Sequence, residues 1–157
     1  MPAPHVPALA GEGPLSYAIF ELARTHRGHA AAMLRKMDLH PGQELLLMHL
    51  FDRDGQTQSE LLERVGVDHS TVSKALRRMQ DAGLLVREPA THDRRVMVVH
   101  LTDKGRALRE PVAAMWRDLE EISTQHLTAQ QAESFVRTAY AVADAISGRT
   151  QPQEQPT

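Results

Sequence analysis

Cysteine is absent from the 157-residue chain, which excludes disulfide bonds, cysteine nucleophiles, thiolate metal sites and sensing by thiol oxidation. The sequence also contains no phosphate-binding loop, no glycine-rich cofactor turn and no zinc-hydrolase pattern, so we do not expect an enzyme. Its first residues, MPAPHVPALAGEGP, hold neither a basic region nor a long apolar run. We therefore expect no signal peptide and no membrane span, but a soluble cytoplasmic protein.

The chain also has no large excess of positive or negative charge, because its formal net charge is only −2. This value argues against a uniformly basic coat for nucleic acid. The charge is unevenly distributed, however: residues 68–95 hold six Lys or Arg against four Asp or Glu, whereas residues 111–157 hold three against six. A locally basic middle is compatible with an anionic partner that binds at one place.

The length suits about one domain with a sizeable core. Residues 1–14 are rich in Pro, Gly and Ala, and residues 148–157 in Gln and Pro, so we expect two flexible tails. Between them the apolar spacing predicts one hairpin and helices over residues 16–37, 43–52, 57–65, 68–81, 102–126 and 127–146. Because Pro111 lies inside the long fifth helix, a bend is expected there.

The third and fourth of these helices form a helix-turn-helix pattern. Thr57 and Glu60 have the spacing of a capping box, and Gly66 suits the end of the short helix. The next helix, in DHSTVSKALRRMQDAG, has apolar residues at helical spacing, namely Val72, Ala75, Leu76 and Met79. The opposite stripe consists of Ser70, Ser73, Lys74 and Arg77. Such a stripe is either a solvated helix face or a surface that recognises a partner.

A β-hairpin is predicted directly after this helix. Two segments rich in Val and Leu, LLVRE and RVMVVHL, lie on either side of the polar loop PATHDR, residues 89–94. A hairpin that follows a recognition-type helix is the wing of a winged helix. The fold class we expect is mainly α with a small β-hairpin wing.

The stretches QSELLERVGVDHSTVSKALRRMQDAGLLVRE and HDRRVMVVHLTDKG resemble the MarR family of bacterial winged-helix transcription regulators. Asp93-x-Arg95, followed by a strand and Leu101-Thr102-x-x-Gly105, matches the wing signature of that family. The resemblance spans about residues 16–147 and implies a winged helix-turn-helix region, 41–110, and a helical dimerisation region, 15–40 and 111–147. His69 departs from the family pattern, in which many members have proline.

The resemblance implies a sequence-specific regulator, which we expect to be a repressor that binds a pseudo-palindromic double-stranded DNA operator as a homodimer. Lys74 and Arg77 offer donors to guanine in the major groove, and Arg95 would enter the minor groove. Asp93 is better placed to hold an arginine than to contact DNA. The DNA-binding candidates are Thr57, Gln58, Ser59, His69, Ser70, Thr71, Ser73, Lys74, Arg77, Arg78, Arg94 and Arg95.

Regulation leaves several alternatives open. A small aromatic effector between the dimer core and the winged helix is the default that the resemblance implies, and we expect no other cofactor. His26 and His29, three residues apart on the first helix, could share a zinc ion, but no third ligand is apparent, so no metal site is assigned. A winged helix that binds a protein instead of DNA is a further alternative, which predicts no steep dependence of DNA affinity on salt.

Overall fold

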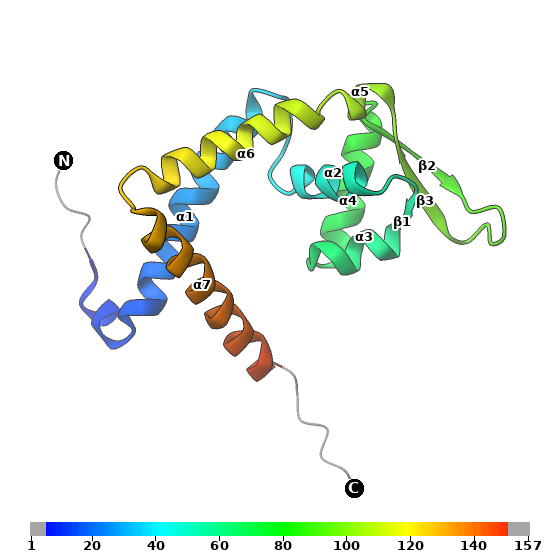
Figure 1. The fold of residues 1–157 in the computed structure, drawn as a ribbon. Coiled ribbons are helices and arrows are strands. Elements are labelled where there is room, and N and C mark those ends of the chain that lie inside the picture. Colours follow the sequence, from blue (N-terminus) through cyan, green and yellow to red (C-terminus); the bar gives the residue numbers. More distant parts are fainter. Residues whose placement is uncertain (1–5, 151–157) are drawn as a thin grey trace, which may run out of the picture. The chain divides into compact units, whose positions relative to one another are not determined.

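The computed structural model describes residues 6–150, with side chains as far as Gly148 (Figure 1). Helices account for most of this part, and they are accompanied by one small antiparallel sheet. The predicted fold class is thereby confirmed. In chain order the elements are η1 (Ala8–Glu12, a 3-10 helix), α1 (Pro14–Arg35), α2 (Gln43–Asp52), β1 (Gln56–Thr57), α3 (Gln58–Val65), α4 (His69–Asp81), β2 (Leu85–Pro89), β3 (Met97–Leu101), α5 (Asp103–Arg106), α6 (Arg109–Thr124) and α7 (Ala129–Thr150).

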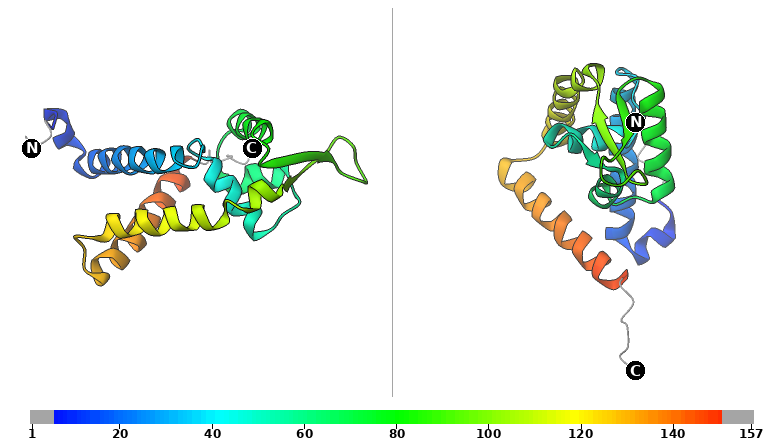
Figure 2. Two further views of the ribbon diagram at one scale, coloured as in Figure 1. Left: turned by 90° about the horizontal axis from the view of Figure 1, so that it is seen from above. Right: turned by 90° about the vertical axis from the view of Figure 1, so that its right-hand side faces the viewer.

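The winged helix consists of α2, α3 and α4 together with a three-stranded sheet in the order β1-β3-β2 (Figure 2). β2 and β3 form the predicted hairpin, with a register that runs from Leu85 opposite Leu101 to Pro89 opposite Met97. The third strand, β1, pairs Gln56 with Val99 and was not predicted. With only two residues, it is too short to show the alternation that identifies a strand in a sequence.

A single apolar core holds the winged helix together. α4 contributes Val72, Leu76 and Met79, each at most 2% exposed, as the apolar stripe of its sequence predicts. Residues from outside the winged helix take part as well, because Leu34 of α1 and Val112 of α6 belong to the same cluster. The buried face of α4 therefore packs in one core with residues of α1 and α6.

Local capping sets the turn between α3 and α4. The Thr57 side chain accepts the N–H of Glu60, the Glu60 carboxylate accepts the N–H of Thr57, and the predicted capping box is thus present. Gly66 ends α3 with a φ of 67°, a left-handed conformation that favours glycine. Asp68 caps α4 by accepting the N–H of Thr71.

The prediction of one long helix over residues 102–126 is wrong. The structure has the short α5 and, from Arg109 to Thr124, the separate α6. Pro111 explains the break, since proline lacks an N–H and its ring collides with the carbonyl group four residues earlier in a continuous helix. In α6, Pro111 instead lies in the first turn, where its missing N–H needs no partner.

Other differences concern the ends of the chain. η1 lies inside the segment 1–14 that we expected to be a flexible tail, and α7 extends beyond the predicted residue 146. Most of the expected C-terminal tail, residues 148–157, lies outside the described residues. The chain divides into two compact units, one of which ends at Arg117 while the other begins at Asp118. None of the described helices has the length and apolar content to cross a membrane.

Candidate nucleic-acid interface

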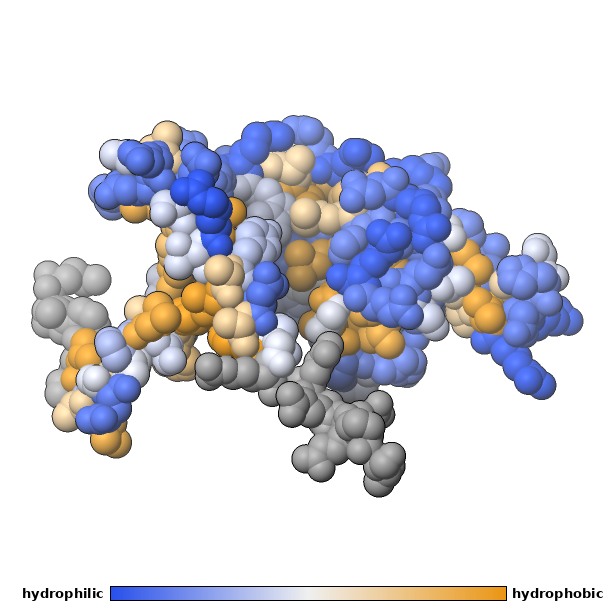
Figure 3. Space-filling view, turned by 60° about the horizontal axis from the view of Figure 1, so that its bottom comes forward, coloured by the Kyte–Doolittle hydropathy of each residue, from blue (hydrophilic) through white to orange (hydrophobic). Residues whose placement is uncertain are grey.

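The outer face of α4 carries the polar stripe of the sequence. Ser70, Lys74 and Arg77 are exposed, and they lie opposite the buried Val72, Leu76 and Met79. Ser73, on one side of this face, is half-buried. Hydrophilic side chains cover much of the winged-helix surface in the space-filling view (Figure 3). Some apolar side chains are exposed between them.

The cations of this face have no acidic partner. Lys74, Arg77 and Arg78 form no ion pair with any residue that the structure describes. Arg78, which lies on the flank of this face, therefore has no acidic partner in the described part of the chain. Three unpaired cations on one exposed helix face are free to meet an anion from outside the protein.

Asp68 organises the beginning of α4. One carboxylate oxygen accepts the hydroxyl of Ser70 at 2.6 Å and the N–H of Thr71 at 3.0 Å, and the other accepts the hydroxyl of Thr71 at 2.5 Å. The bonds from the Ser70 and Thr71 side chains, followed by the Thr71 N–H, hold the pKa of Asp68 well below its usual range. This carboxylate is accordingly ionised whenever the protein is near neutral pH.

The wing loop is shaped by Asp93. Its carboxylate accepts the backbone N–H of Arg95 at 2.9 Å, and its carbonyl oxygen accepts the N–H of Val96 at 3.0 Å. Asp93 thus contacts Arg95 through the backbone N–H of Arg95, and no arginine side chain of the described residues bonds to it. The side chains of Arg94 and Arg95 are exposed and without an ion pair among the described residues.

A cleft of about 220 Å³ joins three parts of this surface. Thr57, Gln58 and Ser59 line it from the beginning of α3, His69 from the beginning of α4, and Arg95 from the wing loop. Five predicted residues from three elements thus come together. Val96 and Met97 also line the cleft. These two apolar residues were not predicted, because in the sequence they look like ordinary strand residues.

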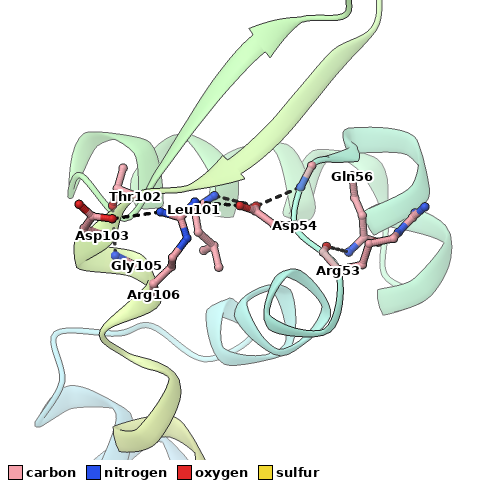
Figure 4. A network of polar contacts seen from close by, with 9 residues as sticks. Arg53, Asp54, Gln56, Leu101, Thr102, Asp103, Gly105 and Arg106 are labelled. Carbon is pink, nitrogen blue, oxygen red and sulfur yellow. Dashed lines mark hydrogen bonds and ion pairs between the residues drawn. The ribbon is translucent and has the colours of Figure 1, made fainter.

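Behind the turn after α2, a polar network connects the sheet to α5 (Figure 4). One oxygen of Asp54 accepts the backbone N–H groups of Gly55 at 3.0 Å and Leu101 at 2.9 Å, and the other accepts Arg106 at 3.1 Å. Arg106 also donates to Asp103 at 3.1 Å. Gln56, fully buried beside this network, donates to the carbonyl oxygens of His49 and Arg53.

The residues from Thr102 to Gly105 contact the turn that follows α4. The Thr102 hydroxyl donates to the carbonyl oxygen of Gly83 at 2.6 Å, and Lys104 donates to that of Ala82 at 2.8 Å. Gly105 approaches Leu84 so closely that a Cβ atom there would lie 2.0 Å from the Leu84 carbonyl oxygen. Sequence reasoning identified Leu101-Thr102-x-x-Gly105 only as a family signature. The structure shows that these residues fix the end of the candidate recognition helix.

The histidines give no sign of a metal site. His26 is half-buried and His29 exposed on α1. Within residues 6–150, nowhere do three or more His, Cys, Asp or Glu side chains gather in a way that could hold a metal ion.

Comparisons with known proteins agree with this architecture. The sequence model of the MarR family matches residues 37–96. The chain is 28% identical over 129 residues to the HTH-type transcriptional repressor Rv2887 of Mycobacterium tuberculosis, covering 82% of this chain and 93% of that protein. The HTH-type transcriptional regulator MgrA of Staphylococcus aureus is 29% identical over 96 residues, covering 60% and 65%.

Solved structures show the same fold. A mutant MarR from E. coli in complex with operator DNA has a TM-score of 0.79 and 23% identity, covering 87% of this chain and 99% of that one. The PcaV transcriptional regulator of Streptomyces coelicolor, in complex with its natural ligand, has a TM-score of 0.78 and 24% identity, covering 90% and 99%.

Proposed function

We propose that the chain is a member of the MarR family of transcriptional regulators, whose sequence model matches residues 37–96, and that it represses transcription by binding an operator sequence. In this proposal α4 enters the major groove of double-stranded DNA, where an α-helix fits. The wing lies over the neighbouring minor groove. A bacterial protein that binds the chromosome is located in the cytoplasm, and this location stays a prediction.

The observation that carries this proposal is the set of unpaired cations on α4 and the wing. We define the unpaired cations as Lys74, Arg77, Arg78, Arg94 and Arg95. Lys74 and Arg77 would donate to guanine O6 and N7, Arg95 to the minor groove, and Arg78 and Arg94 to phosphates. The complex of an E. coli MarR mutant with operator DNA supports this use of the fold.

The cleft supports the placement of four further candidates. Thr57, Gln58, Ser59 and His69 line it together with Arg95, so a DNA strand that passes the wing loop there would meet all of them. The Thr57 side chain itself is bonded to Glu60, because its hydroxyl accepts the N–H of Glu60 at 3.1 Å and also bonds to the Glu60 carboxylate.

We also propose that the protein acts as a homodimer. One winged helix contacts too few bases for high specificity, whereas two related by a dyad would bind half-sites about 34–36 Å apart. Leu15, Phe20 and Leu22 of α1 are at least half exposed, and so are Phe135 and Tyr140 of α7. Apolar side chains exposed in such number suit burial against a second copy.

Release from the operator by a small aromatic effector remains part of the proposal. The PcaV structure with its natural ligand shows that one protein of this fold binds a ligand. An effector can act only by binding more tightly to the protein conformation whose recognition helices do not match the half-site spacing.

Fluorescence anisotropy with DNA from the upstream region of the gene, beside a scrambled duplex, tests the proposal. Wild type should prefer its own sequence by about a thousandfold or more, and Arg77→Ala should reduce that preference about tenfold or more. Arg24→Ala, on α1, is the matched control and should leave it unchanged. Equal binding to both duplexes would refute the proposal, and a monomer by light scattering at micromolar concentration would refute the homodimer.

A further inference from the structure

The two hydroxyls at the beginning of α4 share one carboxylate. Ser70 and Thr71 bond to different oxygens of Asp68, at 2.6 and 2.5 Å. An ionised carboxylate has no proton to give, so each hydroxyl must be the donor. Distances of this size are typical of strong, charge-assisted O–H···O⁻ bonds.

A hydroxyl group has only one proton. Once that proton is held by Asp68, Ser70 and Thr71 can offer their surroundings nothing but oxygen lone pairs. Both residues are exposed, and Ser70 lies on the same face of α4 as Lys74 and Arg77. Two acceptor-only oxygens beside a carboxylate repel phosphate, and they also repel guanine O6 and thymine O4.

We propose that Asp68 makes Ser70 and Thr71 hydrogen-bond acceptors, so that this end of α4 selects bases that present an exocyclic amine, cytosine N4 or adenine N6, in the major groove. The inference rests on the proposed function and adds the kind of base that is recognised. Asp68 acts here as a positioning residue, since it determines specificity through the two hydroxyls.

The substitution Asp68→Asn tests this role of Asp68. Asparagine caps a helix about as well as aspartate, and its single oxygen must stay at the N–H of Thr71 to do so. The oxygen then still accepts the Ser70 hydroxyl, whereas the amide nitrogen replaces the oxygen that faced Thr71. The nitrogen donates to Thr71 and frees its proton, so Thr71 alone becomes a donor.

The experiment is selection from a random duplex library by the full-length wild type, Ser70→Ala, Thr71→Val, Asp68→Asn and Asp81→Asn. Asp81 is the matched control, because it is an exposed carboxylate at the end of α4 that bonds to no described hydroxyl. Ser70→Ala and Thr71→Val should each relax one base-pair position at which wild type selects adenine or cytosine. Asp68→Asn should shift only the Thr71 position, towards guanine or thymine, and Asp81→Asn should shift none.

Base analogues without the amine, purine for adenine or 2-pyrimidinone for cytosine, complete the test. At the Ser70 position, loss of the amine should weaken binding by wild type about threefold to tenfold and leave binding by Ser70→Ala unchanged. If the positions sensitive to Ser70 and Thr71 carry guanine or thymine, or if Asp68→Asn behaves like Asp81→Asn, the inference is overturned while the proposed function stands. Selection of no sequence at all would overturn both.

Discussion

Two groups of cations in the winged helix and α6 differ in what they contact. The unpaired cations of α4 and the wing have no acidic partner among the described residues. A second group, which we name the bonded cations, consists of Arg53, Lys104, Arg106, Arg109 and Arg117. Arg53 pairs with Glu60, Arg106 with Asp54 and Asp103, and Arg117 with Glu110, whereas Lys104 and Arg109 donate to carbonyl oxygens.

This difference separates the residues that hold the protein from those that can bind an outside anion. A bonded cation that left its partner for a phosphate would lose one interaction to gain another. An unpaired cation loses nothing but water and counterions. Charge counts along the sequence cannot make this distinction, because both groups contain exposed arginines. The comparison predicts that the bonded cations affect stability, and the unpaired cations affect DNA binding.

The largest effect on stability should come from a substitution of Gly105, which lies between the bonded cations Lys104 and Arg106. Gly105→Ala places a Cβ atom 2.0 Å from the backbone oxygen of Leu84, and we expect a loss of about 3 kcal/mol in the free energy of unfolding. Gly28→Ala is the control, because a Cβ there meets nothing within 4 Å. This change in the interior of α1 should stabilise by about 0.5–1 kcal/mol. Urea denaturation measures both, and equal stability of the two variants would show that α5 does not fix the end of α4.

A smaller effect is expected for Arg106→Ala. Its two ion pairs are partly exposed, so their removal should lower the free energy of unfolding by about 0.5–1 kcal/mol. Arg77→Ala, which breaks no bond within the described structure, should change it by less than about 0.5 kcal/mol. If Arg77→Ala proved the more destabilising variant in urea, the separation of the two groups would be wrong.

The smallest effect is one of pH. The bond from Arg53, followed by those of Thr57, lowers the pKa of Glu60 from an ordinary 4.5 to about 2. Because the folded-state pKa is the lower one, this contribution to stability is complete above about pH 4.5 and is lost as the pH falls towards 2. Between these values the thermal midpoint of wild type should fall more steeply than that of Glu60→Gln.

Glu63 provides the control for this pH dependence. It is an exposed acid on α3 that forms no ion pair within the described residues. Glu63→Gln should therefore follow the wild-type profile between pH 4.5 and 2. Parallel profiles for wild type and Glu60→Gln would contradict the stabilising role of the Arg53–Glu60 pair.

Sequence patterns predicted the elements that depend on local chemistry. The capping box at Thr57, the left-handed Gly66 and the apolar stripe of α4 each follow from residues a few positions apart. β1 was missed because two residues show no period. The separate α5 and α6 were missed because the pattern alone did not show whether Pro111 bends a helix or begins one.

The candidate site was predicted in part. Local spacing identified the polar stripe of α4, and the resemblance identified Arg95 and Asp93. The sequence did not show that Arg95 and Thr57 line one cleft, since 38 positions separate them. Nor did it show that Asp68 holds the protons of Ser70 and Thr71, because the same residues are equally compatible with simple capping by either Asp68 or Ser70.

The difference between the two groups of cations is tested most directly by the salt dependence of DNA affinity. We would compare wild type with two double variants that remove the same charge, Arg78→Ala/Arg94→Ala and Arg106→Ala/Arg117→Ala. Each phosphate contact contributes about 0.9 to the slope of log affinity against log salt. The first variant should therefore lose about 1.8 of the slope, and the second should keep it. Equal slopes for the two variants would show that only net charge matters, and would contradict the account.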